Sequence, residues 1–181
     1  MYERMTNHFL GGKFGVISHN PFEKEIEDKL KEWAYKTFDA VFVHSQVPVV
    51  GSVLYCNLAL ALEHTGIYVG DNQVVHLNGD GTIEKVSFNE FMARLNGNNI
   101  TFSVFCAVNY FSKSIGGNKI ADRALSMVGK RRNYNIALDN CHRFTSYCLT
   151  GKDCMCTTFT GLEEILKKKY GFHSWKAINL D

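Results

Sequence analysis

Apolar residues recur with helical spacing at both ends of the chain and with strand-like spacing in its middle. Asn20-Pro21 supplies an N-cap and a proline at the first helical position. Apolar residues then follow at three- to five-residue steps, the spacing of one buried helix face. They are Phe22, Ile26, Leu30, Trp33 and Phe38. We therefore expect an amphipathic helix in this first part of the chain.

Short apolar or alternating runs, separated by turn residues, predict a series of strands in the middle. The segments are 40–44, 51–57, 64–69, 73–77, 82–86 and 100–108. The last of them is the most continuous apolar run and therefore predicts a central strand. Before it, Ser87 and Glu90 form a capping box, which predicts a short helix over residues 87–95.

The second half of the chain returns to helical spacing. We expect helices over residues 119–128, 140–149 and 160–169. An order of helix, strands and then helices is typical of an α+β fold, in which an antiparallel β-sheet or meander packs against helices.

Composition and charge narrow the class of protein. The chain has 181 residues, 45% of them hydrophobic, and a formal net charge of +2, so the total charge indicates no nucleic-acid partner. No segment reaches the roughly 18 apolar residues of a membrane-spanning helix, and the start lacks the apolar stretch of a secretory signal. We expect a cytoplasmic protein whose six cysteines stay reduced, with non-classical export as an effector as the alternative.

The segment DNCHRFTSYCLTG, residues 139–151, contains the strongest candidate for chemistry. Asp139 or Asn140 is a good N-cap and would place Cys141 in the first turn of a helix. The free N–H groups and the positive partial charge of a helix N-terminus favour a thiolate, so we expect a lowered pKa for Cys141. A nucleophilic cysteine is one interpretation, and a buried structural cysteine is the other.

Two histidines lie in the predicted hairpin EHTGIYVGDNQVVHLNGDG, residues 63–81. A three-residue turn over residues 70–72 sets His76 opposite Gly66, on the same face as His64, whereas a two-residue turn at Asp71-Asn72 separates the histidines. We prefer the three-residue turn because it keeps four apolar side chains together on the opposite face: Ile67, Val69, Val75 and Leu77.

A shared face would let the two histidines form a relay with a cysteine. One imidazole would take the thiol proton, and the second polar group would fix the tautomer of the first. Two structural histidines, each satisfied by neighbours, are the alternative.

Together the two segments resemble the lecithin:retinol acyltransferase family, the circularly permuted branch of the NlpC-type, papain-like thiol enzymes. The first motif stands here as His64-Thr65-Gly66-Ile67-Tyr68-Val69-Gly70-Asp71, followed by Val74-Val75-His76-Leu77. The second motif stands as Tyr134, followed by Asn140-Cys141-His142-Arg143-Phe144. The resemblance implies a permuted papain-like (NlpC-type) core over residues 48–151. An N-terminal helical extension (1–47) and a C-terminal helical extension (152–181) would pack on the same single domain.

The resemblance also implies roles for individual residues. Cys141 would be the nucleophile, His64 the general base and acid, and His76 the residue that orients His64. Three further residues would lie near the substrate or the oxyanion: Tyr134, Asn140 and His142. The family's Cys-Glu-His-Phe stands here as Cys-His-Arg-Phe, so the substrate does not follow from the motif.

These roles predict a cysteine-dependent acyl enzyme, of phospholipase A or acyltransferase type, that acts on an acyl-ester lipid without a cofactor or metal. A thiol amidase or peptidase of the wider superfamily is the first alternative, and a non-enzymatic interaction module is the second. A zinc site at the same three residues is disfavoured because the sequence lacks a paired CxxC or HxxxH signature.

Three consecutive lysines end the last predicted helix, at residues 167–169. Cations are favoured at a helix C-terminus, so they are interpreted first as a solvated helix end. The alternative is peripheral contact with an anionic membrane surface, together with nearby apolar residues. Those residues are Leu162, Ile165, Leu166, Tyr170, Phe172 and Trp175. The oligomeric state does not follow from the sequence.

Overall fold

The computed structural model describes residues 29, 46–59, 62–92, 104–153 and 156–178. The chain divides into two units, Met1–Lys36 and Thr37–Asp181, and the elements below all belong to the second. The helix predicted after residue 20 and the strand predicted over 40–44 lie outside the described residues, except Lys29, which is helical and exposed.

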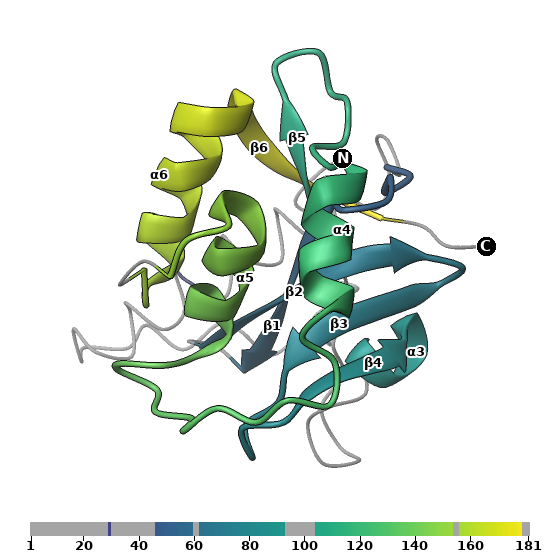
Figure 1. The fold of residues 1–181 in the computed structure, drawn as a ribbon. Helices are drawn as coiled ribbons and strands as arrows, with labels where there is room; N and C mark the ends of the chain where they lie inside the picture. The colour runs from purple at the N-terminus through teal and green to yellow at the C-terminus, as the bar shows by residue number, and fades with distance from the viewer. Residues whose placement is uncertain (1–28, 30–45, 60–61, 93–103, 154–155, 179–181) are drawn as a thin grey trace, which may run out of the picture. The chain divides into compact units, whose positions relative to one another are not determined.

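The second unit is built on a six-stranded sheet in the order β4-β3-β2-β1-β5-β6, with every neighbouring pair antiparallel (Figure 1). The strands are β1 (Val53–Ala59), β2 (Leu62–Gly70), β3 (Gln73–Leu77), β4 (Ile83–Ser87), β5 (Val104–Asn109) and β6 (Phe172–Ala177). The helices are α3 (Phe88–Met92), α4 (Asn118–Leu125), α5 (Cys141–Thr150) and α6 (Phe159–Tyr170). The predicted α+β class, with an antiparallel sheet against helices, is confirmed.

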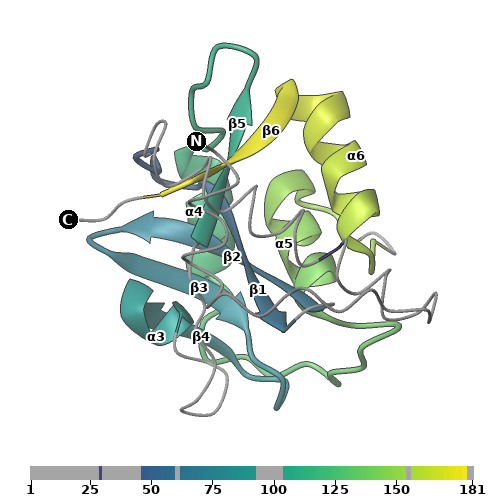
Figure 2. The same cartoon turned by 180° about the vertical axis from the view of Figure 1, so that it is seen from behind.

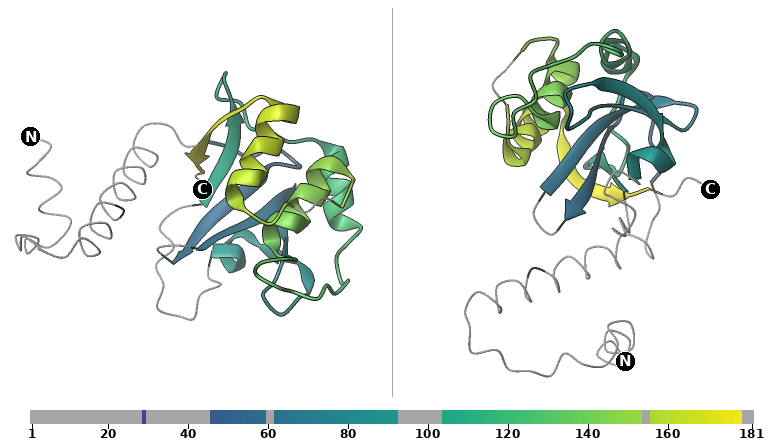
Figure 3. Two further views of the ribbon diagram at one scale, coloured as in Figure 1. Left: turned by 90° about the vertical axis from the view of Figure 1, so that its left-hand side faces the viewer. Right: turned by 90° about the horizontal axis from the view of Figure 1, so that it is seen from below.

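Helices cover both faces of the sheet, which explains why its strands are apolar on both sides. Side chains of α4, α5 and α6 pack on one face with Ile67, Val75 and Leu77. On the other face, Phe88 and Phe91 of α3 pack with the opposite side chains of β1, β3 and β5. Figure 2 shows the sheet from behind, and the right-hand view of Figure 3 shows α5 and α6 on one side with α3 on the other.

The hairpin of β2 and β3 has the preferred register but not the predicted turn. His76 lies opposite Gly66 and Val75 opposite Ile67, as the three-residue turn required. Yet Gly70 pairs with Gln73, so the turn consists of Asp71 and Asn72 alone, both with positive φ (48° and 59°). A register shift between Tyr68 and Gly70 adds the extra residue within the strand. A β-bulge, rather than a three-residue turn, therefore sets His76 opposite Gly66.

Strand β6 is the element that the apolar pattern did not predict. Gly171, with φ 66°, ends α6 in a left-handed cap, and the chain then turns back along β5. Phe172 and Ala177, at its two ends, are buried, and Trp175 is half-buried. The six residues therefore lack the regular alternation of apolar and polar positions that predicts a strand. As a result β5, expected to be central, has neighbours on both sides, β1 and β6.

The apolar residues around the C-terminal lysines face the protein interior. Leu162, Leu166 and Phe172 belong to the core on the helical face of the sheet, and Ile165, Tyr170 and Trp175 pack against it. Lys167 and Lys168 pair with Glu163 and Glu164 one turn earlier, at 3.9 and 3.6 Å. No helix in the described ranges has both the length and the apolar character needed to cross a membrane.

Candidate active site

Helix α5 begins at Cys141 because Asn140 caps it. Asn140 has an extended backbone, and its side-chain oxygen accepts hydrogen bonds from the backbone N–H of His142 (3.1 Å) and Arg143 (3.2 Å). Its amide nitrogen donates to the carbonyls of Ile136 and Thr157, both at 2.8 Å. Asn140, rather than Asp139, is thus the N-cap, and it ties the start of the helix to two separate loops.

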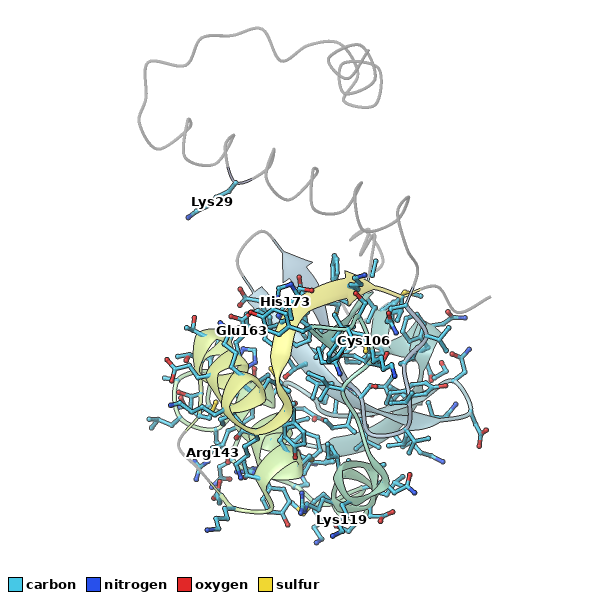
Figure 4. All side chains as sticks on the ribbon, turned by 90° about the horizontal axis from the view of Figure 1, so that it is seen from above. Lys29, Cys106, Lys119, Arg143, Glu163 and His173 are labelled. Carbon is cyan, nitrogen blue, oxygen red and sulfur yellow. The ribbon has the colours of Figure 1, made fainter. Side chains whose placement is uncertain are left out.

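Ion pairs hold the loops on either side of the helix start. Arg132 pairs with Asp139 at 2.8 Å, and Arg143 forms two hydrogen bonds to the Asp153 carboxylate, at 2.9 and 2.8 Å. Arg143 also donates to the carbonyl of Leu138. Figure 4 marks Arg143 among the side chains of the helix layer and Cys106 among those of the sheet. The arginine that replaces a family histidine therefore braces the loops around Cys141.

The thiol of Cys141 is buried against β2, the first strand of the hairpin that carries the histidines. Only 4% of the residue is exposed, and Sγ lies 3.8 Å from the carbonyl oxygen of Glu63. The backbone N–H and hydroxyl of Thr65 also interact with the sulfur. The sulfur therefore contacts β2 at the two residues that flank His64.

The pKa of Cys141 is shifted in the direction opposite to our expectation. Burial raises it above its ordinary value, and this effect exceeds the lowering by hydrogen bonds from Thr65 and from the N–H groups of His142 and Cys141. The helix N-terminus does supply donors, as expected. The expectation of a lowered pKa was wrong because the burial of the thiol follows from β2 packing over it, which the local sequence does not reveal.

His64 and His76 form a direct hydrogen bond on the face of the hairpin that α3 covers. Nε2 of His64 lies 2.9 Å from Nδ1 of His76, and the rings are nearly perpendicular, at 85°. Phe91 of α3 packs on both rings, with centroid distances of 5.4 and 5.6 Å. The two residues are 7% and 0% exposed, so this pair is shielded from water.

Gly66 makes this close approach feasible. A Cβ atom at position 66 would come within 2.8 Å of Val74, 3.0 Å of Phe91 and 3.2 Å of His76. A side chain at this position would therefore crowd the space beside the histidine pair.

A carboxylate that we did not predict lies beyond His76. Glu84 on β4 is the register partner of His76, and its Oε1 is 3.6 Å from Nε2 of the imidazole. The sequence signal was weak: a glutamate in the strand Ile83–Ser87 points to the histidine face only if the β3–β4 register is known.

His142 lies in a second polar group, beside the thiol. Its Nδ1 is 3.4 Å from the hydroxyl of Thr65, which is 3.0 Å from the hydroxyl of Thr145. Burial lowers the pKa of His142 to about 4, so its imidazole is neutral near pH 7. Tyr134 is half-buried, and the nearby Cys141 contributes to the rise of its pKa, after burial. The four residues Tyr134, Asn140, Cys141 and His142 are thus brought together.

Aromatic rings extend from this region across the sheet, another feature that we did not predict. Phe159 lies 5.8 Å from His142, and Tyr55 and Trp175 lie within 5.3 Å of Phe159, centroid to centroid. Phe105 stacks on Tyr55 at 4.8 Å. The rings come from β1, β5, α6 and β6, so only the tertiary structure assembles them.

Among the described residues, no group of three or more histidine, cysteine or acidic side chains is arranged to hold a metal ion. Cys106, Cys141 and Cys148 are free thiols, as expected. Cys154-Met155 lies outside the described residues.

Taken together, these elements define an α+β protein in which a helix presents a buried cysteine to an antiparallel hairpin that carries paired histidines, one on each strand. A family model, lecithin retinol acyltransferase, matches residues 46–154. The chain therefore belongs to this family of enzymes, whose activities are of acyltransferase and phospholipase type. A search of curated proteins finds no match.

Proposed function

We propose that this protein is a cysteine-dependent acyl enzyme in which Cys141 is the nucleophile, His64 the base and His76 the residue that orients His64. The observation that carries the proposal is the buried His64–His76 hydrogen bond of 2.9 Å. His64 makes it from β2, the strand whose backbone contacts the Cys141 sulfur. Membership of an acyl-transferring family supports it.

We infer a role for each nitrogen of His64. Nε2 is engaged with His76, which leaves Nδ1 to take the proton from the Cys141 thiol. The contacts of the sulfur with Glu63 and Thr65, on either side of His64, support this role. Since burial raises the pKa of that thiol, a base is needed at the moment of attack. The mechanism is therefore general-base activation of a neutral thiol.

The acyl transfer then proceeds in two steps, acylation and deacylation of Cys141. The sulfur attacks the ester carbonyl, the C–O bond breaks, and the imidazolium of His64 gives its proton to the leaving alcohol. The product is a thioester on Cys141. Water or an acceptor alcohol or amine next attacks the thioester carbonyl and gives its proton to His64. The C–S bond breaks, and the imidazolium of His64 returns the proton to the sulfur, which restores the thiol. We assign the backbone N–H of Cys141 to the oxyanion of both tetrahedral intermediates.

An acyl-ester lipid is our proposed substrate. The aromatic rings that begin at Phe159, beside His142, offer apolar surface next to the nucleophile, as a fatty acyl chain requires. Contact with an anionic membrane would rest on the lysine side chains 167–169, because the apolar residues near them pack inside the protein. We further propose that the core is a permuted NlpC-type fold, since the histidines precede the cysteine in the chain.

A thiol amidase is the second candidate. It is favoured by the polar group of Thr65, His142 and Thr145, which would suit a peptide or amide better than a hydrocarbon chain. A non-enzymatic interaction module is the third, and it predicts no covalent intermediate at all.

The test is to incubate the protein with phosphatidylcholine vesicles and measure its intact mass. We expect an added acyl mass that is absent in Cys141→Ala and strongly reduced in His64→Ala. Cys156→Ala is the matched control, because it removes another cysteine and should leave the adduct unchanged.

Three outcomes separate the candidates. An acyl adduct on Cys141 supports the lipid enzyme. Cleavage of a peptide or amide panel, with no adduct and no released fatty acid from phosphatidylcholine, would support the amidase instead. Absence of turnover and of adduct on both substrate types would contradict any enzymatic function.

A further inference from the structure

Glu84 lies at the far end of a line of polar groups that starts at the candidate base. The β2–β3–β4 register places Gly66, His76 and Glu84 side by side across three strands. His64 Nε2 is 2.9 Å from His76 Nδ1, and His76 Nε2 is 3.6 Å from Glu84 Oε1. Both nitrogens of His76 therefore have a named polar neighbour, one on each side.

The order of these atoms restricts where the protons are. A carboxylate can only accept, so it favours a proton on Nε2 of His76. Nδ1 of a neutral His76 is then an acceptor, and the hydrogen bond from His64 must be donated by its Nε2–H. This leaves Nδ1 of His64 without a proton, which is the form that a base needs.

We propose that Glu84 is a positioning residue that holds His76 in its Nε2–H tautomer and, through His76, keeps Nδ1 of His64 deprotonated. This inference rests on the proposed function only in taking His64 as the base. It adds a fourth member, from β4, to the three residues that the sequence motifs contain.

The surroundings make a carboxylate effective at this place. His76 is 0% exposed, whereas the Glu84 side chain is 31% exposed. The glutamate side chain is thus partly exposed, while its Oε1, the oxygen nearest the imidazole, is buried. The next residue, Lys85, is exposed and is the register partner of Val75 rather than of His76, so it does not belong to the line of polar groups.

The test reads the tautomer directly. Protein with ¹⁵N-labelled histidine is examined by long-range ¹H–¹⁵N correlation, with His64→Gln and His76→Gln spectra for assignment. In the wild type we expect His76 to be protonated on Nε2. In Glu84→Leu, which keeps the bulk but removes the acceptor, we expect a substantial Nδ1–H population of His76.

The same variants are then compared for formation of the acyl adduct. We expect Glu84→Leu to acylate about tenfold more slowly, the lower end of what carboxylate partners of functional histidines contribute in metal sites. Glu84→Gln retains an oxygen acceptor and should restore both the Nε2–H tautomer and most of the rate. Glu164→Gln, an exposed glutamate on α6, is the matched control and should change neither.

Each result has one meaning. An unchanged His76 tautomer in both Glu84 variants overturns the inference, whatever the acylation rate. A wild-type protein that forms no adduct and releases no fatty acid overturns the proposed function instead, and the tautomer still decides whether Glu84 positions His76. If Glu84→Leu does not fold, Glu84→Asp, whose shorter carboxylate draws back from the imidazole, takes its place in the tautomer measurement.

Discussion

Burial sets the chemistry of Cys141 at the scale of the single residue. Its thiol has helix N-terminal donors and a threonine beside it, yet the net shift of its pKa is upward because solvent is excluded. A preformed thiolate is therefore not the resting state, so the proposed mechanism requires a base to activate the thiol. The sequence revealed the donors, whereas the exclusion of solvent required residues 78 positions apart, Glu63 and Cys141, to meet.

His142 should make the protein sensitive to acid. Its pKa is about 4 in the folded protein and 6.5 ordinarily. Above pH 6.5 it is neutral in both states, so its contribution to stability is complete there. As the pH falls from 6.5 to 4, only the unfolded chain takes up the proton, and the free energy of unfolding drops by about 3 kcal/mol.

Urea unfolding of the wild type and of His142→Gln, each at pH 7 and pH 4, measures this loss. The variant should lose about 3 kcal/mol less than the wild type over the same interval. Thr158→Ala, which removes no titratable group, is the control and should lose as much as the wild type over this interval. An equal loss in His142→Gln and the wild type would contradict the assignment.

At the scale of the element, the start of α5 depends on one side chain. Asn140 accepts two backbone hydrogen bonds and donates two more, to loops at residues 136 and 157. Asn140→Ala should lower the free energy of unfolding by about 2 kcal/mol, at the upper end of the cap range, because the carbonyls of Ile136 and Thr157 also lose their donor. The measurement is urea unfolding at pH 7.

The control for Asn140 is the equivalent cap of α6, where Thr158 accepts from the N–H of Gly161 at 3.1 Å. Thr158→Ala should cost about 1 kcal/mol without slowing acyl-adduct formation on Cys141. Asn140→Ala should slow it, because Cys141, the proposed nucleophile, lies in the first turn of α5. Equal rates in the two variants would show that the cap does not position Cys141.

The hairpin shows where element-scale prediction succeeds and fails. Alternation of apolar and polar residues identified the correct face for each histidine. It did not identify how the chain achieves that register, because a three-residue turn and a two-residue turn with a bulge preserve the same alternation. The tight turn then depends on Asp71 and Asn72, residue types that tolerate positive φ.

At the scale of the whole molecule, Trp175 joins the C-terminal strand to the rest of the second unit. Its ring contacts Tyr55 of β1, Phe159 of α6 and Phe172 of β6, at centroid distances of 4.7, 5.3 and 5.1 Å. Its indole N–H donates to Glu163 at 2.8 Å. Trp175→Ala should lower the free energy of unfolding by about 3 kcal/mol, the lower end for such truncations because the side chain is half-buried.

Trp175→Phe separates packing from hydrogen bonding. It keeps an aromatic ring and loses the bond to Glu163, so it should cost about 1 kcal/mol. Chemical denaturation followed by circular dichroism measures both variants. If Trp175→Ala and Trp175→Phe are equally stable, the aromatic contacts do not hold β6 to the molecule.

The sequence by itself determined the class of fold, the positions of most helices and strands, and the residues that belong to the family motifs. These follow from local physics, namely the 3.6- and 2-residue periodicities, the cap at Asn140 and the glycine at position 66. Only the tertiary structure decided the upward shift of the Cys141 pKa, the carboxylate beside His76, the aromatic rings beside His142 and the sixth strand. Each of these depends on residues that are distant in the chain and meet only when the sheet register and the helix packing are set.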